Sequence, residues 1–223
     1  MTLPEIAFTT ASDGLWLPFI RATFSVIETP PTKVNSGLVT MDVKALTIPD
    51  VKILNLKKFE DARGFFSETY NKKALSDLGI DLEFVQDNQS LSAAVGTIRG
   101  LHYQTHPFAQ DKLVRVVRGR ILDIAVDIRR SSPTFGKWVA AEISAAMWNQ
   151  ILIPIGFAHA ICTLEPNTEL IYKVTNYYSP QHDFGIRWND PDLAIEWPFA
   201  LDQVVVSDKD RKQPFFRDVI NWF

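Results

Sequence analysis

The spacing of short apolar segments constrains the fold of this chain more than any other feature. Beyond residue 41 these segments are rich in β-branched residues and end at turn signals such as Ser132-Pro133 and Pro166-Asn167. The turn signals recur at intervals near the ~8–12 residues typical of antiparallel sandwiches, and no alternation of strand and helix is visible. The pattern predicts an all-β, double-sheet jelly roll, with room for a ligand pocket at one mouth. The expected strands are 51–56, 113–117, 121–128, 138–143, 151–153, 158–164 and 170–175.

Few helices are expected. One is predicted at 72–78, because Gly79 follows it and glycine favours the left-handed conformation that ends a helix. Residues 1–40 are rich in Thr, Ser and Pro and show no sustained period. We therefore predict an N-terminal extension over 1–40, which is either the result of a misplaced start codon or a docking arm, and one jelly-roll domain over 41–223.

Charge and cysteine content exclude several classes of protein. The chain has 23 Lys and Arg against 26 Asp and Glu, a net charge of -3 that favours neither nucleic acid nor an acidic membrane as partner. No run reaches the ~18 apolar residues of a membrane-spanning helix, and the N-terminus lacks the order of a signal peptide. The single cysteine, Cys162, cannot form an intrachain disulfide, which favours a reducing compartment. We predict a cytoplasmic protein.

The histidines are the first candidates for chemistry. Side chains alternate along a strand, so His102 points to the other face from its neighbours Leu101 and Tyr103. His102 either belongs to an inward-facing polar row or is a hydrogen-bonded core residue. The segment ending in His159 resembles the second half of the cupin metal signature. The first half is incomplete, because Gln104 occupies the second ligand position, and two histidines make a poor metal site. We predict no bound metal.

Other polar residues could serve the same pocket. Tyr172 alternates with Ile171 and Lys173, so its hydroxyl could donate a proton beside His102, or it could be a core aromatic residue. The cations that an anionic ligand would need lie near apolar or glycine-rich stretches, although each could also be a solvated surface charge. They are Arg63, Arg99, Lys112 and Lys209.

Taken together, eight motifs in order make the chain from about Met41 onward similar to the dTDP-4-dehydrorhamnose 3,5-epimerase family, whose fold is cupin-like. The motifs are Asp61-x-Arg-Gly-Phe-Phe-x-Glu68, Phe84-Val-Gln-Asp-Asn-x-Ser90, Arg99-Gly-Leu-His-Tyr-Gln104, Lys112-Leu-Val-Arg-Val116, Asp127-Ile-Arg-x-x-Ser-Pro-Thr-Phe-Gly-x-Trp138, Ile153-Pro-x-Gly-Phe-Ala-His159, Tyr172-Lys-x-Thr-Asn-Tyr-Tyr178 and Ser207-x-Lys-Asp210. Residues 1–40 have no counterpart in the family pattern.

The resemblance implies an isomerase without a cofactor that acts on a dTDP-sugar, as a homodimer. It implies epimerisation at C3 and C5 of dTDP-4-dehydro-6-deoxy-D-glucose to dTDP-4-dehydro-L-rhamnose, a step of dTDP-rhamnose biosynthesis. In this pattern His102 is the base, oriented by Asp210; Tyr172 is the acid; and Lys112 holds the C4 oxygen. The implied contacts to substrate are Arg63, Glu68, Gln86, Asn88, Arg99, His159, Asp183 and Lys209. Asp183 stands where the family often has Glu.

Two alternatives remain open at this point. A related enzyme that epimerises only C3 or only C5 of a dTDP-4-keto sugar would use the same residues in a pocket of another shape. A non-catalytic or metal-binding cupin would use His102 and His159 structurally. Proton exchange at the sugar carbons, together with metal analysis, separates these readings.

Overall fold

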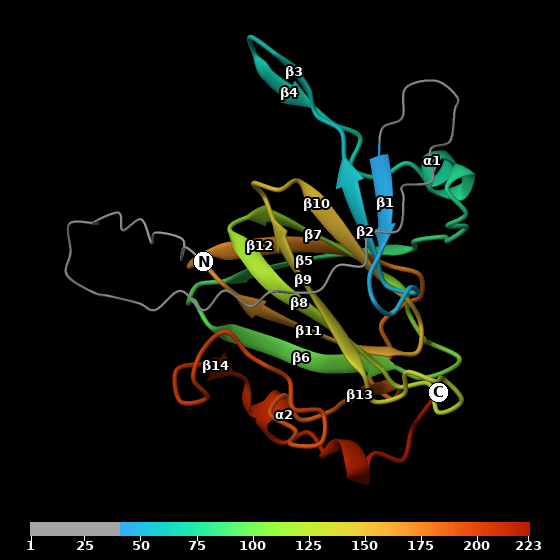
Figure 1. Ribbon diagram of the computed structural model, residues 1–223, viewed down its shortest axis with the longest axis vertical. Coiled ribbons are helices and arrows are strands. Elements are labelled where there is room, and N and C mark those ends of the chain that lie inside the picture. The colour runs from blue at the N-terminus through green and yellow to red at the C-terminus, as the bar shows by residue number, and fades with distance from the viewer. Residues whose placement is uncertain (1–40) are drawn as a thin grey trace, which may run out of the picture.

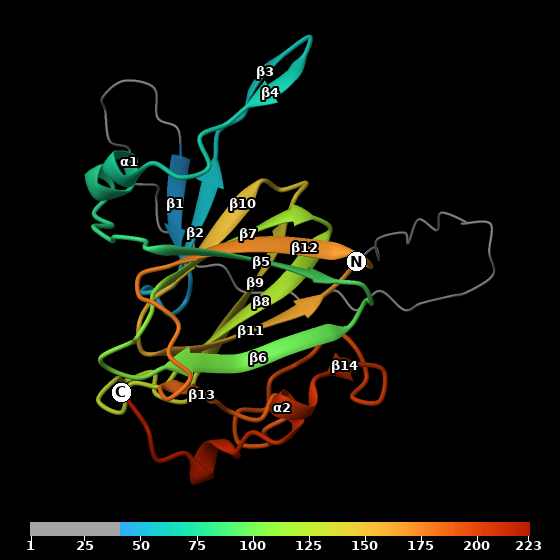
Figure 2. The ribbon, with the colours of Figure 1, turned by 180° about the vertical axis from the view of Figure 1, so that it is seen from behind.

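Two antiparallel sheets stacked face to face form the body of the protein, as Figures 1 and 2 show from opposite sides. The computed structural model describes residues 41–223, so the predicted extension over 1–40 lies outside the described residues. The first sheet has six strands in the order β1 (Met41–Ala45), β2 (Lys52–Leu56), β10 (Asn149–Ile153), β7 (Lys112–Arg118), β12 (Thr168–Val174) and β5 (Gln86–Ser92). The all-β jelly roll is confirmed.

The second sheet lies across the first and carries the C-terminal part of the chain. Its order is β13 (Asp183–Gly185), β6 (Thr97–Gln104), β11 (Phe157–Thr163), β8 (Arg120–Asp127) and β9 (Trp138–Ser144), and β14 (Val205–Val206) pairs with β6 in parallel. The remaining elements are the hairpin of β3 (Phe59–Asp61) and β4 (Gly64–Phe66), the helices α1 (Lys72–Asp77) and α2 (Asp208–Arg211), and a 3-10 turn at Phe216–Asp218.

Most expected elements are present. The seven predicted strands correspond to β2 and to β7 through β12, and the predicted helix is α1, whose N-cap Asn71 accepts a hydrogen bond from the backbone N–H of Ala74. The pattern did not reveal β5, because this edge strand is polar except for Leu91 and contains no β-branched residue.

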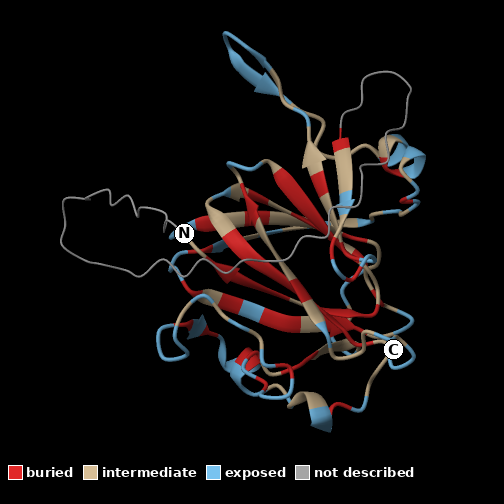
Figure 3. Cartoon of the chain, in the orientation of Figure 1, coloured by how far each residue is buried: buried red, intermediate tan, exposed pale blue. Residues whose placement is uncertain are grey.

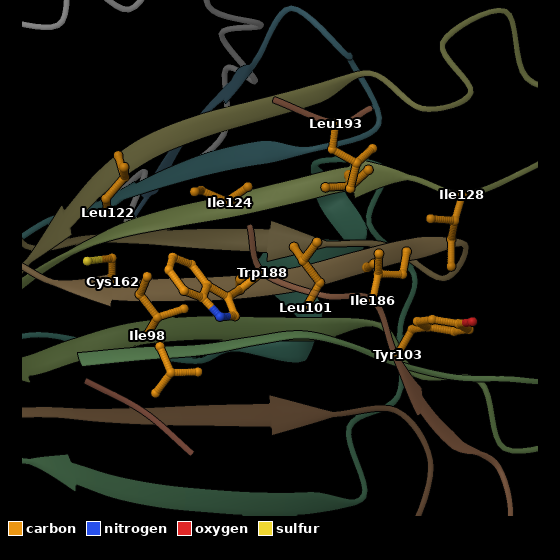
Figure 4. Close-up of a cluster of buried hydrophobic side chains, with 14 of the residues drawn as sticks. Ile98, Leu101, Tyr103, Leu122, Ile124, Ile128, Cys162, Ile186, Trp188 and Leu193 are labelled. Carbon is orange, nitrogen blue, oxygen red and sulfur yellow. The ribbon is translucent and has the colours of Figure 1, made fainter. Parts of the chain in front are cut away.

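Apolar side chains fill the fold in three places. Residues of both sheets, including Val114, Ile121 and Ile151, pack between them. Figure 4 shows a second cluster, in which Leu101 and Ile124 of the second sheet meet side chains of the C-terminal segment, residues 186–223. A third cluster lies under α1 on the first sheet. The C-terminal segment is therefore packed against the outer face of the second sheet.

The β3–β4 hairpin differs from the rest of the molecule. It projects from the body in Figures 1 and 2 and is coloured as exposed in Figure 3. Its Phe65 and Phe66 are 51% and 66% exposed. Within residues 41–223, no helix is long and apolar enough to cross a membrane.

Candidate active site

A cavity of about 560 Å³ opens between the two sheets beside the C-terminal segment. Strands β5 and β12 of the first sheet line it on one side, and β6 and β11 of the second sheet line it on the other. The structure brings all of the predicted catalytic residues and part of the predicted contact residues to this cavity. They are His102, Lys112, Tyr172, Asp210, Arg99, His159 and Lys209.

His102 and Asp210 form a hydrogen-bonded pair, with 2.5 Å between His102 Nε2 and Asp210 Oδ1. They are far apart in sequence but close in space, because β14 pairs with β6 and leads directly into α2. The N-cap of α2, Ser207, accepts a hydrogen bond of 3.1 Å from the backbone N–H of Asp210. Burial alone would raise the pKa of Asp210, but the hydrogen bonds from His102 and Ser207 hold it below its usual value. The carboxylate is therefore ionised beside the imidazole.

Lys112 enters the same cavity from β7. Its Nζ donates a hydrogen bond of 3.3 Å to the backbone carbonyl of His102. Burial lowers the pKa of Lys112 to about 8, while the carboxylates of Asp183 and Asp123 act in the opposite direction. At pH 7 this amine is mostly charged and can stabilise negative charge that develops near it.

Tyr172 faces the cavity from β12, in the sheet opposite His102. Its register partners are Asn88 on β5 and Val114 on β7. Burial raises the pKa of Tyr172, and the nearby charge of Arg99 acts against this rise. The hydroxyl is therefore protonated at neutral pH, the state in which it can donate.

A second histidine–carboxylate pair lies deeper in the cavity wall. His159 Nε2 is 2.9 and 3.0 Å from the two carboxylate oxygens of Asp123, which is fully buried on β8. Burial raises the pKa of Asp123, and His159 and Lys112 counteract this rise. Sequence reasoning missed Asp123. The available signal was a carboxylate in the middle of the apolar strand 121–128, and the identity of its partner depends on the pairing of β8 with β11.

Polar groups also gather where β13 meets the C-terminal segment. Lys209 Nζ donates to Asp183 Oδ2 at 2.6 Å, and the hydroxyl of Tyr178 donates to the same oxygen at 3.1 Å. Asp183 does not itself line the cavity, but it joins a lining lysine to an exposed aromatic ring. Tyr178 is thus a further candidate contact that the sequence did not single out.

The remaining predicted contacts do not line the cavity of this chain. Arg63 lies at the tip of the β3–β4 hairpin, pairs with Asp61 and is 90% exposed. Glu68 follows the hairpin and accepts a hydrogen bond from Asn71. Gln86 donates to Asn88 on the inner face of β5. Their contacts to a substrate remain predictions.

A double-sheet jelly roll whose cavity holds a carboxylate-bound imidazole, an amine and a protonated phenol is an enzyme built for acid–base chemistry. The family model described as dTDP-4-dehydrorhamnose 3,5-epimerase matches residues 45–218. The chain belongs to the dTDP-4-dehydrorhamnose 3,5-epimerase family.

Individual relatives agree with this assignment. The dTDP-4-dehydrorhamnose 3,5-epimerase of Sinorhizobium fredii is 49% identical over 174 residues, which cover 78% of this chain and 89% of that protein. The crystal structure of the enzyme from Bacillus anthracis, with TDP and PPi bound, is 51% identical with a TM-score of 0.76 and covers 78% of this chain and 99% of its own. The Legionella pneumophila enzyme in complex with dTDP-4-keto-L-rhamnose is 42% identical with a TM-score of 0.77, covering 81% and 95%.

Proposed function

We propose that this protein converts dTDP-4-dehydro-6-deoxy-D-glucose to dTDP-4-dehydro-L-rhamnose by epimerisation at C3 and C5. One observation carries the proposal: the His102–Asp210 pair and the Tyr172 hydroxyl face a single cavity from opposite sheets, with the Lys112 amine in the same space. Inversion of a carbon centre requires a base on one side and an acid on the other, and the two sheets supply them.

The first step is removal of a proton from the carbon beside the C4 ketone. Because Nε2 of His102 is bonded to Asp210, Nδ1 is the nitrogen whose lone pair can accept that proton. The ionised Asp210 then stabilises the imidazolium that forms. The electron pair of the broken C–H bond moves into an enolate, whose charge on the C4 oxygen is stabilised by the ammonium of Lys112.

The second step returns a proton to the opposite side of the same carbon. Tyr172 donates it from the first sheet, the enolate becomes a ketone again, and the configuration is inverted. His102 then loses its proton to solvent and Tyr172 regains one from solvent, after which the same cycle at the second carbon completes the double epimerisation. Since no electrons are gained or lost overall, the proposed reaction requires no redox cofactor.

The nucleotide part of the substrate is anionic, and the cavity supplies cations for it. Lys209 and Arg99 line the cavity, and Arg99 has no carboxylate partner within residues 41–223. We assign the diphosphate to these two residues and further substrate contacts to His159, Gln86, Asn88 and Asp183. A nucleotide-sugar substrate, together with the free buried thiol of Cys162, favours the cytoplasm as the site of the reaction.

We further infer a homodimer in which the β3–β4 hairpin of one copy completes the cavity of the other. Arg63 and Glu68 are predicted contacts that do not reach the cavity of their own chain. The hairpin projects into solvent with two exposed phenylalanines, a surface that a second copy could cover. An intersubunit contact reconciles the predicted role of these residues with their position.

Mixing inactive variants tests this assembly. H102A and R63A, each inactive alone, should regain part of the activity when refolded together, because one of the two cavities then combines an intact His102 with an intact hairpin. A mixture of H102A with Y172F should regain none, since both defects stay in the cavity of their own chain. A monomer by light scattering, or no regain in the first mixture, would contradict the homodimer proposal.

The catalytic proposal is tested with the full chain, dTDP-4-keto-6-deoxyglucose and deuterated water. We expect deuterium at both C3 and C5 of the sugar, followed by NMR. Deuterium at one carbon alone would support the single-position epimerase, and its absence from both would support a non-catalytic cupin.

A further inference from the structure

The inner face of β5 carries a row of polar side chains, of which Ser90 lines the cavity, and the last residue of the row has no role in the proposed reaction. Gln86, Asn88, Ser90 and Ser92 alternate with exposed residues, so they share one face. Ser92 is only 4% exposed. A buried hydroxyl is unfavourable unless it is hydrogen-bonded, so its partner indicates what it does.

That partner is Arg99. Its Nε donates to Ser92 Oγ at 3.1 Å, and its Nη2 donates to the backbone carbonyl of Leu91 at 3.3 Å. Both acceptors belong to the end of β5, where the chain crosses from the first sheet to β6 of the second. The guanidinium is thus hydrogen-bonded to the end of β5, where the two sheets connect, although Arg99 itself is exposed at the cavity.

The two hydrogen bonds leave the guanidinium available to an anion. It has five N–H donors, and only two of them are used here. No carboxylate neutralises it within the described part of the chain, whereas the lining residues His102, His159 and Lys209 each pair with an aspartate. A long flexible side chain that is already held in place loses less conformational entropy when it binds a ligand.

We propose that Ser92 is a positioning residue, which orients the guanidinium of Arg99 for the diphosphate of the nucleotide-sugar. This inference rests on the proposed function and adds a specific source of substrate affinity to it. It assigns to Ser92 an effect on nucleotide binding and none on proton transfer, because the base and the acid lie elsewhere in the cavity.

The variants that test it are S92A, S92T, R99A and the double variant S92A/R99A, each measured for dTDP binding by calorimetry and for turnover of the dTDP-keto sugar. Losing a hydrogen bond that orients a charged group should weaken dTDP binding and raise KM by about 5- to 20-fold, with kcat within about twofold of wild type. S92T keeps the hydroxyl and should restore most of the affinity. In the R99A background, S92A should add less than about twofold, because the group that it orients is gone.

Ser144 offers a matched control. It is also 4% exposed, and its hydroxyl accepts a hydrogen bond from the backbone N–H of Met147, away from the cavity. S144A removes a buried hydroxyl of the same kind and should leave dTDP binding unchanged even if the melting temperature falls.

Three results would overturn the role of Ser92 alone: S92A binds dTDP like wild type, its effect persists in full in R99A, or kcat falls while KM does not change. A wild-type protein that neither binds dTDP nor turns over the sugar would overturn the proposed function as well. Normal wild-type turnover with an unaffected S92A would reject only the inference about Ser92.

Discussion

Among single residues, Asp210 supports the proposed base, because its carboxylate is hydrogen-bonded to His102. We expect D210N to keep the fold and the affinity for substrate, because an amide still fits beside His102. Its kcat should fall by about 10²–10⁴-fold, since the amide cannot stabilise the imidazolium and can favour the wrong tautomer. Steady-state kinetics and a thermal melt measure both quantities. A wild-type kcat would show that Asp210 does not act through His102.

The amine of Lys112 predicts a pH dependence. A lysine is charged below its pKa, which is about 8 here, so the charged amine is lost as the pH rises through that value. We expect kcat/KM to fall above about pH 8. Tyr172 cannot cause this decline, because burial raises its pKa above the ordinary tyrosine value. In K112R the cation persists at alkaline pH, and the decline near pH 8 should disappear. An identical decline in both proteins would assign it to another group.

Residue-level prediction from sequence succeeded where the motif or the alternation is local. Strand alternation left open whether Tyr172 shares a pocket with His102 or is a core aromatic residue, and in the structure both side chains line the same cavity. Asp210 followed only from the family resemblance, because its contact with His102 spans 108 residues of sequence. Asp123 was missed, since a buried carboxylate cannot be matched to its histidine before strand pairing is known.

At the scale of elements, the short helix α2 delivers Asp210 to His102. Its N-cap serine holds the backbone of Asp210 directly. We expect S207A to destabilise the protein by about 0.5–2 kcal/mol, the usual effect of losing an N-cap. It should also lower kcat on the order of tenfold, because a displaced carboxylate orients the imidazole poorly.

S207T is the control for this prediction, because its hydroxyl can cap the same N–H. Denaturant unfolding and turnover are compared for the three proteins. If S207A lost stability and kept full kcat, the placement of Asp210 would be shown to depend on the pairing of β14 with β6 and not on the cap.

Strands were predictable from the sequence where both of their faces are buried or where buried and exposed residues strictly alternate. The apolar strands β8 and β11 stand out in the sequence, while the polar edge strand β5 and the two-residue strand β14 do not. Both of these weakly marked strands contribute to the cavity wall. β5 is hard to recognise because a strand that faces a polar ligand does not carry the apolar pattern of a buried strand, and β14 because it has only two residues.

At the scale of the whole molecule, the described residues contain every predicted site residue. We therefore expect a protein that begins at Met41 to keep the turnover of the full chain, with at most a small change in melting temperature. The measurement compares kcat, KM and thermal unfolding of the two proteins. An inactive or insoluble truncation would show that residues 1–40 belong to the functional fold.

We propose that His102 and Tyr172, which lie on opposite sheets, divide proton removal and proton return between them. The most direct test follows deuterium uptake at C3 and C5, together with product formation, in wild type, H102A and Y172F. We predict that H102A loses both deuterium exchange and product formation, because it lacks the imidazole that removes the proton. Y172F should retain part of the exchange after product formation has fallen. Near-normal exchange in H102A, or equal loss of exchange and product in Y172F, would contradict the claim.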